Sequence, residues 1–139
     1  MPNWCENELR IVANTTKEVT DFLDRYSLKT GEGDGCGFDF DKIVPEPRKV
    51  EDCPIDCLVN DDNHIEIYED RPWFDWYKWR NKYWGVKWNA RDVSIDVHMK
   101  DTTIYINFFT PWGEPTEIID ALKEQNPHLG IKNLSSDQW

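Results

Sequence analysis

The stretch that decides the fold is VSIDVHMKDTTIYINFF, residues 93–109. Its odd-numbered residues from 93 to 99 are apolar, and so are its even-numbered residues from 104 to 108. A period of two is typical of strands that bury one face and leave the other in water. Because Asp101-Thr102 between the two halves is suited to a turn, the stretch predicts a β-hairpin.

The segments on either side of this hairpin extend the pattern. Residues 4–13 alternate in the same way, and residues 15–26 begin with a capping box and continue with one apolar helical face. Residues 115–127 predict a second amphipathic helix, and residues 129–134 predict a last short strand. Strand, helix, two strands, helix, strand is the split βαβ order. We therefore expect an α+β, ferredoxin-like βαββαβ domain over residues 1–139, with four antiparallel strands in spatial order 4-1-3-2.

A large insertion, about residues 29–90, separates the first helix from the second strand of this pattern. Residues 38–44 predict an accessory strand, and residues 65–68 a short strand. Pro72 predicts the first turn of a helix that continues to about Tyr83. Residues 51–70 hold eight acidic residues and no lysine or arginine, so most of this segment is expected to be irregular.

The net charge of the chain is −11, and it limits the kinds of partner. An acidic surface repels nucleic acid and anionic lipid, whereas it suits solubility, a basic protein partner or mimicry of a polyanion. No apolar stretch approaches the ~20 residues that cross a bilayer, and residues 1–5 do not resemble a signal peptide. We therefore expect a cytoplasmic protein, with reduced cysteines and no membrane or nucleic-acid partner.

Four segments of the sequence resemble the YubB-type ferredoxin-like domain family. They are MPNWCEN (1–7), FDFDKIVP (38–45), WGVKWNA (84–90) and FTPW (109–112). The resemblance spans nearly the whole chain and implies a ferredoxin-like fold in a protein of phage, plasmid or bacterial origin. It implies no catalytic activity and no cofactor. The sequence departs from the family at Val86, where a threonine is expected, and at Gly113-Glu114-Pro115, where a serine and two prolines are expected.

The predicted topology gathers the tryptophan-rich segments at one end of the sheet, because strands one and two begin where strands three and four finish. The candidate partner- or ligand-binding residues at this end are Asn3, Trp4, Trp84, Lys87, Trp88 and Trp112. Two interpretations stay open. The segments form either a concave aromatic site with Lys87 as its charged anchor, or a second core whose indole N–H groups donate to asparagines such as Asn7 and Asn89.

Two further groups of residues carry chemical alternatives. Residues 71–91 hold six basic and eight aromatic residues, a mixture that can grip single-stranded nucleic acid but can equally form an amphipathic helix paired with the acidic segment. Cys36, Cys53, Cys57 and His64 could ligate zinc. Their irregular spacing favours free thiols instead, and we predict no metal.

No nucleotide-binding loop, zinc-protease motif or nucleophile elbow is present in the sequence. The leading hypothesis is therefore a non-enzymatic phage or plasmid accessory protein without a cofactor, which binds a protein partner through an acidic surface, with polyanion mimicry as one version. The alternative hypothesis is binding of nucleic acid or a small ligand at the tryptophan-rich end. Neither the partner nor the oligomeric state follows from the sequence.

Overall fold

A computed structural model describes residues 3–60 and 65–138 of the chain. Its strands form one antiparallel sheet with the order β2-β3-β4-β1-β5. The strands are β1 (Trp4–Val12), β2 (Gly31–Glu32), β3 (Arg91–His98), β4 (Thr103–Pro111) and β5 (Gly130–Gln138). The predicted hairpin is β3 and β4, joined by a single 3₁₀ turn at Met99–Asp101.

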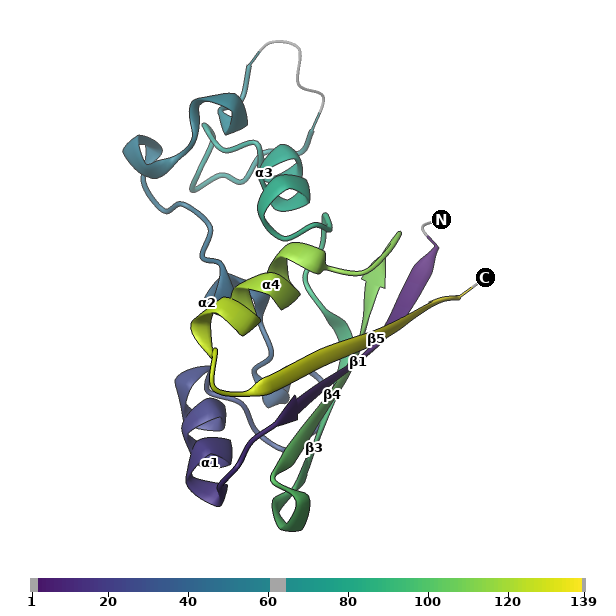
Figure 1. The fold of residues 1–139 in the computed structure, drawn as a ribbon. Helices are drawn as coiled ribbons and strands as arrows, with labels where there is room; N and C mark the ends of the chain where they lie inside the picture. Colours follow the sequence, from purple (N-terminus) through teal and green to yellow (C-terminus); the bar gives the residue numbers. More distant parts are fainter. Residues whose placement is uncertain (1–2, 61–64, 139) are drawn as a thin grey trace.

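Three of the four α-helices in the described ranges lie on one face of this sheet. The four are α1 (Thr16–Arg25), α2 (Phe40–Ile43), α3 (Trp76–Tyr83) and α4 (Thr116–Gln125). Figure 1 shows α1, α2 and α4 over one face of the sheet, while α3 and the rest of the insertion extend beyond the end where both termini lie. No helix in the described ranges has the length and apolar character needed to span a bilayer.

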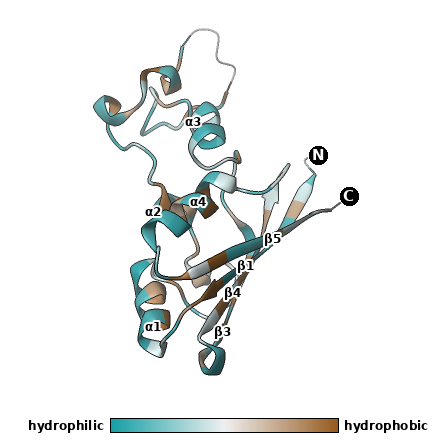
Figure 2. Cartoon of the chain, viewed as in Figure 1, coloured by the Kyte–Doolittle hydropathy of each residue, from teal (hydrophilic) through white to brown (hydrophobic). Residues whose placement is uncertain are grey.

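The register of the sheet confirms most of the predicted burial pattern, although Val97 is only half-buried and Met99 is exposed. Leu9 and Ile95 both pair with Ile106, and all three are at most 2% exposed beneath the helices. Their neighbours Glu6 and Asp96 are exposed on the open face. Hydrophobic and hydrophilic stretches accordingly alternate along the strands in Figure 2. Period-two alternation identified the buried face because a strand turns successive side chains to opposite sides.

The N-termini of two helices are explained by their capping residues. At α1 the backbone N–H of Glu18 donates to Thr15 Oγ1 over 3.1 Å, and the Glu18 carboxylate accepts from the backbone N–H of Asn14 over 2.8 Å. The bond to Thr15, the N-cap residue, is half of the predicted capping box; the returning bond from Glu18 reaches Asn14, one residue before the N-cap. Helix α3 begins at Trp76 rather than at Pro72, because the carboxylate of Asp75 accepts the backbone N–H of Lys78 over 3.0 Å.

Three sequence predictions differ from the structure. The strand order differs from a four-stranded sheet because β2 adds a fifth strand outside β3. Residues 38–44 contain the helical turn α2 instead of a strand: Asp39 caps it, and Phe40 and Ile43 lie three residues apart on one buried face. Residues 65–68 form no strand; only Tyr68 makes an isolated bridge, to Arg71.

A buried carboxylate holds the insertion together. Glu46 is 6% exposed, and Arg80 Nε donates to its Oε2 over 2.7 Å. Arg71 and Arg48 approach its other oxygen at 3.5 and 3.8 Å. Three arginines around one carboxylate compensate a charge that would otherwise be costly to bury. The acidic segment is tied to α3 at the surface by an ion pair between Asp56 and Lys82, at 3.0 Å.

Candidate binding surface

The structure brings three of the candidate tryptophans together at one end of the sheet. Trp4 begins β1 and pairs with Pro111 at the end of β4. The rings of Trp4 and Trp88 lie 5.9 Å apart, and the backbone N–H of Trp112 donates to Asn3 O over 2.7 Å. The topological prediction for these residues is therefore confirmed, including the placement of Asn3 beside Trp112.

Trp84, by contrast, belongs to the core. It is 1% exposed, and its indole N–H donates to the backbone oxygen of Val44 over 2.9 Å. Phe40 and Trp79 pack against its ring in edge-on arrangements, with centroid separations of 5.6 and 5.7 Å. Because no face of the indole reaches solvent, Trp84 cannot contact a partner, and its inclusion among the binding residues is wrong.

The asparagines do not serve the indoles as predicted. The side-chain oxygen of Asn89 accepts the backbone N–H of Phe40 over 3.0 Å, and its amide donates to Asp39 over 2.6 Å. Asn7 donates to the hydroxyl of Thr110 over 2.9 Å. Asn89 thus satisfies a backbone group at the start of α2, where no ladder partner exists, and Asn7 joins the side chains of β1 and β4. Carbonyl oxygens of the insertion satisfy the indoles instead, as when Trp76 donates to Glu66 O over 2.7 Å.

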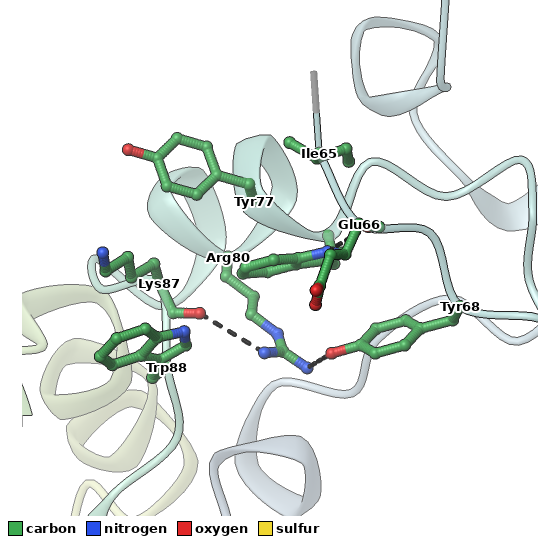
Figure 3. Close-up of a pocket in the computed structure, with 8 residues that line it drawn as sticks. Ile65, Glu66, Tyr68, Tyr77, Arg80, Lys87 and Trp88 are labelled. Atoms are coloured by element: carbon green, nitrogen blue, oxygen red, sulfur yellow. Dashed lines mark hydrogen bonds between the residues drawn. The ribbon is translucent and has the colours of Figure 1, made fainter. Parts of the chain in front are cut away.

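Two adjoining hollows lie between the insertion and the end of the sheet. The first has a volume of about 530 Å³ and is shown in Figure 3. It is lined by Ile65, Glu66, Tyr68, Trp76, Tyr77, Arg80, Lys87 and Trp88. The second has about 330 Å³ and is lined by Tyr77, Asn81, Gly85, Val86, Lys87, Pro111, Trp112 and Gly113. Because Tyr77 and Lys87 line both, we treat the pair as one surface, the aromatic groove.

Arg80 forms part of the floor of the groove and is already engaged within the protein. Its guanidinium donates to Glu46, to the hydroxyl of Tyr68 at 2.9 Å and to the backbone oxygen of Lys87 at 3.4 Å, as Figure 3 shows for the last two. It also lies 5.2 Å from the centroid of the Trp76 ring. Arg80 therefore fixes the shape of the groove rather than offering a free cation.

Lys87 stands at the boundary between the two hollows. Its Nζ lies 4.4 Å from the centroid of the Trp88 ring. The ring of Trp4 lies beside that of Trp88, and the guanidinium of Arg91 lies 5.2 Å from the centroid of the Trp4 ring. A cation over an aromatic face gains electrostatic attraction while keeping its hydrogen-bond donors in water. Lys87 can thus contact a bound partner without being desolvated in advance.

Trp112 is the most exposed aromatic residue of the groove. It is 62% exposed, and its φ of +69° lies in the left-handed region. The other non-glycine residues of the described chain with positive φ are the small polar Ser27, Asp92 and Thr102. A bulky residue in this conformation is rare, and such strain often marks a functional position. Tyr77, on the same groove, is 47% exposed.

Acidic side chains border the groove. Glu66 lines the first hollow. Beside the second hollow, the carboxylate of Glu117 lies directly against Gly85, whose φ is +83°. Glu114 is exposed just after Gly113 and accepts from the amide of Asn133 over 3.0 Å. Aromatic faces within an acidic border suit apolar and positively charged side chains of a partner.

The thiols of Cys53 and Cys57, in the insertion, are poorly suited to nucleophilic chemistry. Burial raises the pKa of the Cys57 thiol to about 11 and raises the pKa of Cys53 as well, with Asp56 adding to both effects. Within residues 3–60 and 65–138, no group of three histidine, cysteine or acidic residues could hold a metal ion. His64 lies outside the described residues. The prediction that Cys36, Cys53, Cys57 and His64 bind no zinc therefore stays a prediction.

Lys87 and Trp112 were predicted from the sequence to lie on this surface, whereas Tyr77 was not. The signal was present, since Tyr77 and Asn81 are four residues apart on the helix that the sequence predicted and share its polar face. Tyr68 could not be assigned, because its place in the groove depends on the hydrogen bond from Arg80 across the insertion.

Comparison with known proteins gave no relative: no family model, no curated protein and no solved structure matches this chain.

Proposed function

We propose that this protein is a non-enzymatic binding protein whose protein partner docks in the aromatic groove. The observation that carries the proposal is Trp112, an indole displayed to solvent from a strained backbone. Exposure of the ring and a positive φ both disfavour tryptophan at this position, so stability does not account for it. Tryptophan, tyrosine and arginine are the residues most enriched at the energetic centres of protein interfaces.

The partner segment should carry basic and apolar side chains. Its apolar groups would cover Trp112 and Tyr77, and its cations would meet Glu66, Glu114 and Glu117 at the border of the groove. The chain's net charge of −11 would steer such a segment towards the protein and speed the encounter. Mimicry of a polyanion towards a nucleic-acid-binding protein is one form of this proposal.

Capture from bacterial lysate, followed by binding measurements with the purified captured protein, tests this role. Trp112→Ala and Tyr77→Ala should each weaken binding at least about tenfold, the lower range for interface hot spots. The matched control is Ile55→Ala, which removes a side chain that is 88% exposed but does not line the groove. This variant should bind like the parent, and binding to the parent should weaken as salt rises.

The same measurements can contradict the proposal. A partner that binds the parent and all three variants with equal affinity would move the interface away from the groove. A partner whose affinity does not change with salt concentration would contradict the role assigned to the acidic border.

Binding of nucleic acid or a small ligand at the same end is a second candidate. It is favoured by the two neighbouring indoles of Trp88 and Trp4, with the cations of Lys87 and Arg91 on either side of them. Single-stranded nucleic acid uses aromatic rings beside cations for stacking and phosphate contacts. These aromatic faces already carry the protein's own cations, however, and the chain is strongly acidic. We expect binding of oligothymidylate no tighter than ~10⁻⁴ M at physiological salt. Micromolar binding, measured by fluorescence anisotropy and abolished in Lys87→Ala, would favour this candidate over a protein partner.

We also propose that the sheet and its helices are a ferredoxin-like βαββαβ domain elaborated by the insertion. The order β3-β4-β1-β5 of the four longer strands, with α1 and α4 on one face, supports this arrangement. Membership of the YubB-type family, with origin in a phage or plasmid and residence in the bacterial cytoplasm, is proposed on the four resembling segments alone. Purification of the native protein from the cytoplasmic fraction of a bacterium that encodes it would test the location.

A further inference from the structure

The two edges of the sheet are built differently. At one edge, β2 pairs with β3 at Ile95 and Ser94, and β3 is irregular between Arg91 and Ser94, where Asp92 has a φ of +51°. A short edge strand and a bulge are two ways in which proteins prevent their sheets from pairing with other chains. This edge is therefore protected.

The opposite edge, β5, has neither kind of protection. Its residues pair with β1 in an uninterrupted register from Gly130 to Gln138, and within the described chain no segment pairs with its outer side. Figure 1 shows β5 at the outer edge of the sheet. The strand contains no proline and has one lysine, Lys132. Alternate residues of such an edge turn their backbone N–H and C=O groups outward, ready to pair with another strand.

The composition of β5 is also unusual for this chain. Lys132 and Asp137 cancel, so the strand has no net charge in a protein whose net charge is −11. On the open face of the sheet, Leu134 is 41% exposed. A strand of no net charge is the part of an acidic surface that a second copy of the same chain can approach with the least repulsion, and Leu134 gives it an exposed apolar side chain at its centre.

We propose that this edge is a homodimer interface, in which β5 pairs antiparallel with β5 of a second copy. With a two-fold axis perpendicular to the sheet, the open faces of both copies lie on the same side. Residues that lie opposite each other across the interface are then both even-numbered or both odd-numbered. Centred on Leu134, the pairing sets this side chain against its own copy and sets Lys132 against Ser136. No two like charges lie opposite each other in this register.

The acidic charge of the two copies should make dimerisation depend on the salt concentration. Helix α4 packs on β5 and exposes Glu117, Asp120 and Glu124, so the acidic helices of the two copies approach each other across the axis. Salt screens this repulsion, and association should therefore strengthen as salt rises. Binding of a basic partner in the groove has the opposite dependence, so the two proposals fail independently.

Sedimentation velocity over about a hundredfold range of protein concentration tests the dimer. The purified chain should shift from monomer to dimer, and the shift should occur at lower concentration in high salt. Leu134→Lys places two ammonium groups opposite each other and should remain monomeric over the same range. A monomer at every concentration and salt would overturn the proposal, as would a dimer that Leu134→Lys does not weaken.

Crosslinking tests the register in a background with Cys53→Ser, because Cys53 is the only partly exposed cysteine and the other three are buried. Leu134→Cys should crosslink rapidly with a short bismaleimide. Lys132→Cys is the matched control on the same face. In the proposed register its two copies lie four residues apart along the strand, about 13 Å, and should crosslink poorly. Equal crosslinking at both positions, or preference for position 132, would contradict the pairing centred on Leu134.

Discussion

Trp84 and Trp112 lie on neighbouring parts of the same end of the molecule, yet they differ in burial, in hydrogen bonding and in backbone conformation. Trp84 is 1% exposed, with its indole N–H bonded to Val44 O and aromatic rings around it. Trp112 is 62% exposed on a backbone with a φ of +69°. The first residue contributes buried apolar area, whereas the second leaves its area in water and strains the chain.

The contrast shows that the tryptophan-rich end is both core and surface. The buried part, around Trp84, Arg80 and Glu46, joins the insertion to the sheet. The displayed part, around Trp112 and Tyr77, stands on it. Changes in the buried part should therefore act mainly on stability, and changes in the displayed part mainly on binding. This division is testable, and the largest change in the free energy of unfolding is expected in the buried part.

Removing the buried indole should have the largest effect. Trp84→Ala deletes a fully enclosed ring and leaves the carbonyl of Val44 without its donor, so the free energy of unfolding should fall by about 3–5 kcal/mol. Urea denaturation would measure it. Trp84→Phe keeps much of the apolar volume and should lose clearly less. A loss below about 0.5 kcal/mol in Trp84→Ala, the usual range for surface changes, would show that this indole is not part of the core.

The carboxylate beneath the groove should come next. Glu46→Gln leaves Arg80, whose side chain is 14% exposed, without its anion, and leaves Arg71, 12% exposed, with only the exposed Asp70 at 3.7 Å. We expect a loss of about 3 kcal/mol. The matched control is Glu8→Gln, which breaks the exposed ion pair with Arg10 on the open face. It should cost no more than about 1 kcal/mol in the same denaturation experiment. Equal losses in the two variants would argue that the buried cluster does not anchor the insertion.

The stability of the insertion should depend on alkaline pH through Cys57. A thiol whose folded pKa is raised from 9.0 to about 11 contributes stability that is complete below pH 9 and is lost as pH rises towards 11. Cys57→Ala lacks this titration. The difference in unfolding free energy between parent and variant should therefore shrink by about 2 kcal/mol across that interval. A difference that stays constant with pH would mean that the thiol is not held in its neutral form by the fold.

The smallest change is expected at the displayed indole, and it has the opposite sign. Trp112→Gly relieves the positive φ and should raise the free energy of unfolding. The gain should be about 1 kcal/mol or less, because the greater flexibility of glycine in the unfolded chain offsets part of it. Thermal denaturation would measure the gain, with Tyr77→Ala near parental stability as the control. A stability loss of several kcal/mol in Trp112→Gly would place this residue with Trp84 and remove the main support for the groove as a docking site.

The sequence by itself determined the sheet and its buried face. Alternation with a period of two identified the hairpin of β3 and β4, and residues such as Leu9 and Ile106 were predicted to lie beneath the helices. The capping box at Thr15 predicted the start of α1. These features depend on near neighbours along the chain, whose geometry is fixed by the backbone. Strand topology then sufficed to bring Trp4, Trp88 and Trp112 to one end.

Only the tertiary structure decided how the insertion folds and which indoles it covers. Phe38 and Phe40 alternate as in a strand, but the Asp39 cap and the burial of Ile43 make a helical turn there. The exposure of Trp112 and the enclosure of Trp84 depend on contacts between residues far apart in the sequence, such as Arg80 with Glu46, 34 residues away. Both residues sit in similar aromatic sequence contexts, and local pattern cannot separate them. Burial is a property of what packs against a side chain, and for these tryptophans that packing comes from the insertion folding back over the end of the sheet.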